Sequence, residues 1–160
     1  HGLLAGLAFG LSGYLHQQTR TLDMEKIQGL LAGMPFWGTL MIMALMAGCG
    51  LPGFANFAGE LTVFFGAWEV YPVITGIAVW SALVIGAVYM LRAIRKLLHG
   101  LKGEATPEIE DITSWQRLPY AILLTVLLLF GFYPRLITEK INQSEPTFSQ
   151  ATATQPKDTE

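Results

Sequence analysis

Residues 48–65, GCGLPGFANFAGELTVFF, decide the fold, because they interrupt a long apolar run and then place one carboxylate, Glu60, within it. The apolar run extends from about residue 36 to 68. An unbroken helix of that length would measure roughly 50 Å, well beyond the ~30 Å hydrocarbon core of a bilayer. The sequence therefore predicts one discontinuous crossing, with a helix to about Gly48, a loop to about Ala55 and a second helix after it.

The residue types at the interruption explain why the chain would break there. Pro52 disfavours helical angles at the residue before it, and Gly50 and Gly53 permit irregular backbone. Asn56 follows as a candidate N-cap of the second half-helix. We therefore assign a supporting role around the break to Pro52, Gly50, Gly53 and Asn56.

Charge is distributed unevenly along the chain. Hydrophobic residues make up 52% of the sequence and charged residues 14%. Between residues 27 and 91 the charged side chains are Glu60 and Glu69, and residues 118–134 carry none. A soluble helical protein would show a polar face on these segments, which they lack. The pattern predicts an all-α, multi-spanning transmembrane helix bundle with one broken helix.

The remaining segments complete the predicted organisation. An apolar segment of about 16 residues opens the chain without an initiator Met, so we expect a truncated helix and a C-terminal piece of a longer protein. A polar stretch rich in Gln, Ser and Thr ends the chain and predicts a disordered tail. The predicted boundaries are a transmembrane region at 1–141, with a partial helix at 1–16, the broken helix at 36–68 and helices at 71–93 and 118–133, and a tail at 142–160.

Two packing features also follow from the sequence. Gly2, Gly6 and Gly10 recur every four residues, so they share one helix face and predict close approach of a neighbouring helix along it. Trp37 and Trp68 stand near the two ends of the broken segment. Tryptophan is enriched at membrane–water interfaces, so we expect both to be interfacial anchors.

The basic residues of the connecting loops predict the orientation in the membrane. Arg20 and Lys26 follow the first segment, and residues 92–117 contain further Arg and Lys after the third. The turn at Glu69 contains no basic residue. The positive-inside rule then places the first and third loops in the cytoplasm, and the Glu69 turn and the C-terminus outside.

The sequence excludes several kinds of site. It contains no Gly-rich phosphate loop, no Cys or His cluster with metal-ligand spacing, and no nucleophile with a base nearby. The basic residues at 92–102 are explained by topology or by anionic lipid headgroups, so they do not indicate nucleic-acid binding. Glu60 remains as the informative residue.

A carboxylate at bilayer depth costs at least about 2.5 kcal/mol, so it usually faces the bundle interior or water and serves an ion or proton path. Irregular backbone at that depth also needs cover from protein or a water-filled cavity. The break and Glu60 together therefore predict a small hydrated pocket. Burial there favours the neutral acid, while the second half-helix's N-terminus favours the anion. Two other interpretations stay open, namely a protonated Glu60 that only bonds to another helix and a half-helix lying at the interface.

His1 is a second candidate proton group. It is the other titratable side chain at comparable depth apart from the tyrosines. A lone histidine is more often a hydrogen-bonded packing residue than a relay. The sequence leaves both roles open for His1.

Three stretches carry a resemblance to a known family: GLPGFANFAGELTVFFGAWEVYPVITG, SGYLHQQTRTLDM upstream of it and LLLFGFYPRLI downstream. They resemble the antiporter-like membrane subunits of proton-translocating NADH:quinone oxidoreductase, respiratory complex I, and among these subunit M. The resemblance covers about residues 1–141. It departs from the family at Gln18, where many members have a histidine. It implies inverted repeats that each contain a broken helix, of which this chain holds the second.

The resemblance also implies a function. Glu60 matches the acid at the exit end of the family's polar axis, and His1 is similar to a histidine found in many members. No redox cofactor is then expected in this chain. Flavin and iron–sulfur clusters would lie in partner subunits, with quinone as substrate of the complex, and enzyme status would belong to the assembly.

The resemblance sets the expected surroundings as well. Partners would be other membrane subunits, especially neighbouring antiporter-like ones, and the lipid bilayer, with no nucleic acid. We expect the bacterial plasma membrane, with the C-terminus on the periplasmic side. Two alternatives are a subunit of a multi-subunit cation/proton antiporter and a structural membrane subunit whose Glu60 is inert.

Overall fold

The computed structural model describes residues 1–100, 109–136 and 139–140. Every regular element within these ranges is a helix, which confirms the predicted all-α class. The elements are α1 (Gly2–Thr19), α2 (Leu30–Gly33), α3 (Pro35–Gly48), α4 (Ala55–Val70), α5 (Pro72–Leu98) and α6 (Arg117–Phe132). The tail predicted to be disordered, 142–160, lies outside the described residues.

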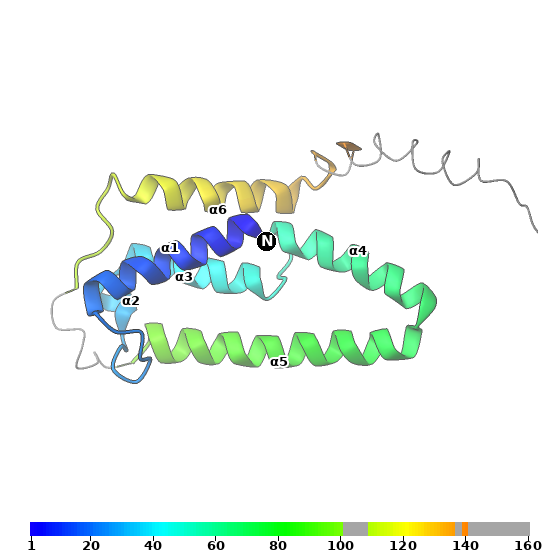
Figure 1. Ribbon diagram of the computed structural model, residues 1–160, viewed down its shortest axis with the longest axis horizontal. Coiled ribbons are helices and arrows are strands. Elements are labelled where there is room, and N and C mark those ends of the chain that lie inside the picture. Colours follow the sequence, from blue (N-terminus) through cyan, green and yellow to red (C-terminus); the bar gives the residue numbers. More distant parts are fainter. Residues whose placement is uncertain (101–108, 137–138, 141–160) are drawn as a thin grey trace, which may run out of the picture.

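The broken helix is present as predicted, with α3 and α4 as its two halves. They contain 14 and 16 residues and are separated by residues 49–54. At 1.5 Å per residue they measure only about 21 and 24 Å, so neither half covers a ~30 Å hydrocarbon core alone. Figure 1 shows α3 and α4 following one another along the continuous helix α5.

The helices lie side by side with their axes roughly along one direction. In Figure 1, α6 lies on one side of the bundle, α5 lies on the other, and α1, α3 and α4 run between them. Helix α1 packs against α3 and α6, whereas α4 packs against α5 and α6. The N-terminus lies near the middle of the bundle's length, beside the break between α3 and α4 (Figure 1).

Helix α1 packs through its leucines, and not through its glycines as predicted. Leu4, Leu7, Leu11 and Leu15 are buried, and their spacing places them on one helical stripe. A Cβ added at Gly2 or Gly6 would meet no atom within 4 Å, so those positions are open in the described chain. Gly10 alone of the three supports the prediction, since a Cβ there would lie 2.9 Å from the Tyr120 ring.

Trp37 is fully buried, so its prediction as an interfacial anchor is wrong. Its indole N–H donates to the carbonyl of Leu11 at 2.9 Å, which joins α3 to α1. A buried indole N–H needs an acceptor, and the helix face opposite α3 provides one. Trp68, at the other end of the broken helix, is 54% exposed.

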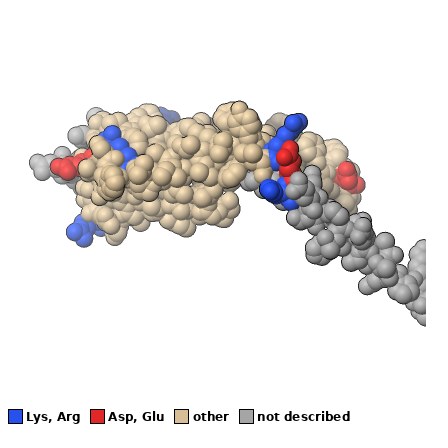
Figure 2. Space-filling model, turned by 90° about the horizontal axis from the view of Figure 1, so that it is seen from above, with Lys and Arg blue, Asp and Glu red and all other residues tan. Residues whose placement is uncertain are grey.

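The surface supports an orientation of the bundle across a membrane. Among the described helices, α5 is long and apolar enough to cross a bilayer, and α3 and α6 are apolar but shorter. On the face shown in Figure 2, Lys, Arg, Asp and Glu gather towards the two ends and leave an uncharged band between them. The loop after α1 and the end of α5, predicted to share one side, are joined by a 3.3 Å ion pair between Lys96 and Glu25.

Candidate functional site

The break ends α3 with a Schellman motif. The amide of Gly50 donates to Ala47 at 3.2 Å and the amide of Leu51 donates to Met46 at 3.4 Å, so two carbonyls at the helix end find partners. Gly50 has a φ of 66°, and Gly53 further along has a φ of 102°. Both values lie in the left-handed region that glycine adopts at little cost, which explains why glycine occupies these positions.

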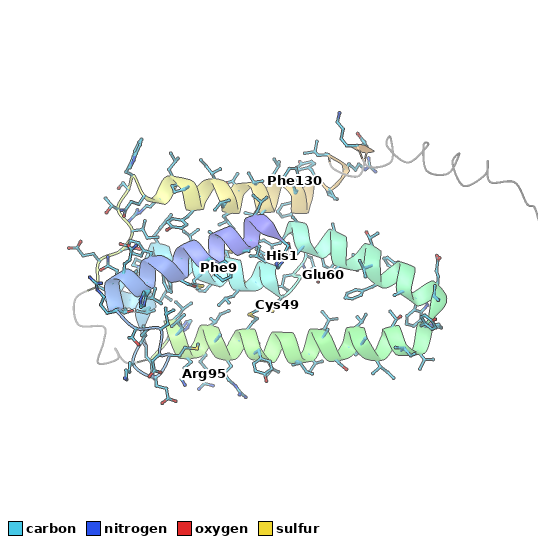
Figure 3. The ribbon with its side chains drawn as sticks, viewed as in Figure 1. His1, Phe9, Cys49, Glu60, Arg95 and Phe130 are labelled. Carbon is cyan, nitrogen blue, oxygen red and sulfur yellow. The ribbon has the colours of Figure 1, made fainter. Side chains whose placement is uncertain are left out.

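Glu60 reaches back from α4 to this break. It lies in the second turn of α4, and helical side chains lean towards the N-terminus of their own helix. Its carboxylate lies so close to the Cα of Gly50 that a Cβ added there would collide with Oε2. The acid and the irregular backbone are therefore packed against each other, as Figure 3 shows at mid-length of the bundle.

A hollow of about 510 Å³ opens beside Glu60. Three helices line it, and Figure 3 shows His1 from the start of α1, Glu60 from α4 and Phe130 from α6 around the same point. Asn56 also lines it, so the structure brings together the three polar residues that the sequence singled out. The full lining is His1, Leu3, Ala55, Asn56, Gly59, Glu60, Leu127 and Phe130.

The Glu60 carboxylate is not neutralised within the described chain. The ion pairs found there join Lys26 to Asp23, Lys96 to Glu25 and Arg117 to Asp111. Glu60 thus belongs to no ion pair among the described residues, although it is half-buried. No Lys or Arg side chain of the described residues therefore holds the Glu60 carboxylate in place.

Asn56 is not the N-cap of α4, so that prediction is wrong. Helix α4 begins at Ala55, and the capping position is held by Phe54, which makes no side-chain cap. Phe54 is buried with 6% exposure, and its extended backbone turns the chain into the helix. Burial of this large ring decides the helix start, and Asn56 is left in the first turn with its side chain on the hollow.

Helix α6 closes over the break at a glycine that the sequence did not single out. A Cβ added at Gly131 would collide with the backbone of Gly53 and Phe54. Gly131 therefore lets α6 approach the break within backbone contact. The signal in the sequence was a single glycine in the apolar run that precedes Pro134.

Metal binding is not supported by the described residues. In the ranges that the structure describes, no group of three or more His, Cys, Asp or Glu side chains is arranged to hold a metal ion. The chemistry available at the hollow is that of a carboxyl, an imidazole and an amide, which suits proton transfer.

A family model described as NADH:quinone oxidoreductase/Mrp antiporter, TM, matches residues 1–86. This match covers more than half of the chain, including α1, the break and all of α4. The chain belongs to this transmembrane family. It is a membrane protein on that ground, and the hollow beside Glu60 lies largely within the matched region.

Similar proteins narrow the comparison within the family. NADH-quinone oxidoreductase subunit M of Escherichia coli K12 is 34% identical over 141 residues, covering 87% of this chain and 28% of the relative. The subunit M of Rhodobacter capsulatus is 30% identical over 145 residues, covering 90% of this chain and 28% of the relative. NAD(P)H-quinone oxidoreductase chain 4 of a Synechococcus strain is 33% identical, covering 87% of this chain and 28% of the relative.

A solved structure of the same kind matches the fold. Respiratory complex I from Thermus thermophilus with bound NADH contains a chain with a TM-score of 0.69 and 29% identity, covering 78% of this chain and 26% of that chain. The chain thus spans less than a third of the length of the relatives it matches. The resemblance to the complex I membrane subunits, expected from residues 48–65 and their flanks, is confirmed.

Proposed function

We propose that this chain is part of a membrane subunit of NADH:quinone oxidoreductase and moves protons across the membrane, coupled to electron transfer from NADH to quinone. The observation that carries the proposal is the Glu60 carboxylate, packed on the break of the discontinuous helix and opening into a hollow shared with His1 and Asn56.

The depth of the hollow supports a transfer role. Figure 3 shows His1 and Glu60 near mid-length of the bundle. A lone ionisable group at such depth is costly, and it persists where an ion or proton path needs it. Glu60 would take up a proton on one of its carboxylate oxygens and release it in the next step, with the His1 imidazole as a second acceptor on the same hollow.

The surrounding residues would keep this acid in place. The left-handed backbone at Gly50 and Gly53 maintains the break, and Pro52 prevents α3 and α4 from merging into one helix. The amide of Asn56 would hold a water or the carboxylate itself. Each of these residues would help to keep the Glu60 carboxylate beside the hollow.

The rest of the function belongs to an assembly. This chain would carry no redox centre, with flavin and iron–sulfur clusters in partner subunits and quinone as the substrate of the whole complex. Its neighbours would be other antiporter-like subunits in the plasma membrane of a bacterium, with the C-terminus on the periplasmic side. The relatives named above are quinone oxidoreductase subunits, which favours this function over a cation/proton antiporter.

NADH-driven proton uptake by membrane vesicles that carry Glu60→Gln tests the role of Glu60. We expect proton uptake to fall on the order of tenfold, because glutamine matches the size of the acid but can neither bind nor release the proton. Glu69→Gln is the matched control, since Glu69 is an exposed residue near the end of the same helix. Normal proton uptake by an intact Glu60→Gln complex would rule out the proposed role.

A further inference from the structure

The start of α3 lies far from Glu60, and a residue distant in sequence caps it. Helix α3 begins at Pro35, which has no N–H, after Met34, whose side chain makes no cap. The next two amides, those of Phe36 and Trp37, therefore need acceptors from elsewhere.

Asp111 supplies both acceptors. Its Oδ2 accepts from Phe36 N at 2.8 Å and its Oδ1 accepts from Trp37 N at 3.1 Å. These are the second and third amides of the helix, the ones that an N-cap side chain normally serves. Asp111 lies 75 residues beyond Phe36, in the connection before α6. The capping residue of a helix is usually adjacent to it in sequence, whereas here it comes from a distant part of the chain.

Arg117 holds the capping carboxylate in place. Its guanidinium lies 3.9 Å from Asp111 Oδ2, and its Nε donates to the Ile112 carbonyl at 2.7 Å. The same guanidinium lies 4.6 Å from the centre of the Phe36 ring, within the range of a cation–π contact. Asp111 also accepts from the amide of Ile112 at 2.8 Å. The cap is thus fixed from α6 as well as from α3.

Two of the helices that line the hollow, α1 and α6, are joined near this same end of the bundle. The Tyr14 hydroxyl of α1 donates to the Glu110 carbonyl at 3.2 Å, next to the cap. The Tyr120 hydroxyl of α6 donates to the Gly10 carbonyl of α1 at 3.3 Å. Movement of the Asp111 connection would therefore be transmitted to α1, α3 and α6 together.

The opposite end of α3 is the break that supports Glu60. An α-helix of 14 residues is a stiff segment about 21 Å long, so fixing its start also fixes where Gly50 lies. We propose that Asp111 is a positioning residue that holds α3 in register and thereby keeps the Glu60 carboxylate packed against Gly50. This inference rests on the proposed function only in the experiment that measures proton pumping, and not in the one that measures labelling of Glu60.

Carbodiimide labelling of Glu60 in the assembled complex tests the proposal directly. We expect Asp111→Ala to speed adduct formation on the Glu60 peptide by on the order of fivefold, because losing one helix cap shifts a local opening by about that factor. Glu69, measured by mass spectrometry in the same sample, should react at its original rate. Protons pumped per electron should fall as well, although electron transfer per assembled complex persists.

Two variants make the test specific. Asp111→Asn keeps one acceptor oxygen, so its labelling rate should lie between those of the wild type and Asp111→Ala. Glu110→Ala removes the neighbouring exposed carboxylate, whose backbone carbonyl is the part that bonds to Tyr14, and it should label like the wild type.

Wild-type labelling of Glu60 in assembled Asp111→Ala would overturn the proposal and reduce Asp111 to a local cap. If Asp111→Ala does not assemble, Asp111→Asn decides in its place, and an unchanged rate there overturns the proposal too. Normal pumping by Glu60→Gln would remove the proposed function but leave the labelling result valid, so the two failures are distinguishable.

Discussion

The two halves of the broken helix begin in opposite ways. The first amides of α3 are capped by Asp111, which Arg117 holds in place. Helix α4 begins after buried Phe54 without a side-chain cap, and no described side chain replaces it. The capped start lies at one end of the bundle, and the uncapped start lies at mid-length beside Glu60 (Figure 3).

The two helix starts differ in role: the start of α3 is held by other parts of the chain, whereas the start of α4 lies beside the candidate proton site. Helix α3 is tied to α1 by the Trp37 indole and to the connection before α6 by Asp111. The start of α4 has no side-chain cap, and the positive end of its helix dipole favours an anion. One crossing therefore combines a half whose start is capped by a distant side chain with a half whose start has no side-chain cap.

The largest expected effect comes from the contact that covers the uncapped start. Gly131→Ala should destabilise the bundle by about 3 kcal/mol, because its methyl group would collide with the Gly53–Phe54 backbone, which cannot rotate away as a side chain does. The thermal loss of assembled complex in detergent measures this effect.

Gly86→Ala in α5 is the matched control for this prediction. A Cβ at Gly86 meets no atom within 4 Å in the described chain, and alanine favours the helix, so stability should not fall. Equal melting of the two variants would mean that backbone contact with α6 does not hold the start of α4.

An intermediate effect is expected at the end of the capped half. Gly50→Ala should cost about 2 kcal/mol, since a residue with a Cβ is strained at a φ of 66° and its methyl group would displace the Glu60 carboxylate. Combining it with Glu60→Ala removes the collision but leaves the strain. The double variant should then be more stable than the sum of the two single losses predicts, and strict additivity would show that the acid and the break are not packed together.

The smallest effect concerns a single hydrogen bond that anchors α3. Trp37→Phe keeps an aromatic ring but loses the indole bond to Leu11, so the bundle should lose about 1–2 kcal/mol, with the Leu11 carbonyl still served by its own helix. The same thermal assay measures it, with Trp68→Phe as the control at the exposed end. A larger loss for Trp68→Phe would reverse the assignment of the fixed half.

The break was predictable because its causes are local. The apolar run is too long for one helix across a bilayer, so an interruption was required. Pro52, which disfavours helical angles at the residue before it, and two glycines showed where in the sequence the interruption lies. Asn56 and Glu60 are spaced by one helical turn, which places them on one face of α4, and both line the hollow. The exact side of the membrane that each end faces stays a prediction.

Other features depend on contacts between distant segments, which local patterns do not reveal. Asp111 caps a helix 75 residues away, and nothing around it in sequence marks it as a cap. Trp37 is of a residue type common at membrane interfaces, but it is buried against α1. Phe54, and not Asn56, occupies the N-cap position of α4, because its large side chain is buried there. In each case the outcome depends on tertiary packing, which local sequence patterns do not encode.

The continuous helix α5 limits how the broken one can move. Because Pro72 starts α5 directly after the turn at Tyr71, the far end of α4 is fastened to a helix of 27 residues that runs beside both halves. A tilt of α4 about the glycines of the break would therefore have to carry the start of α5 with it. Glu60 lies about 8 Å from that pivot and Val70 about 22 Å, so a tilt displaces the carboxylate only about a third as far as the end of the helix. Glu60 therefore lies near the part of α4 that moves least when the helix tilts.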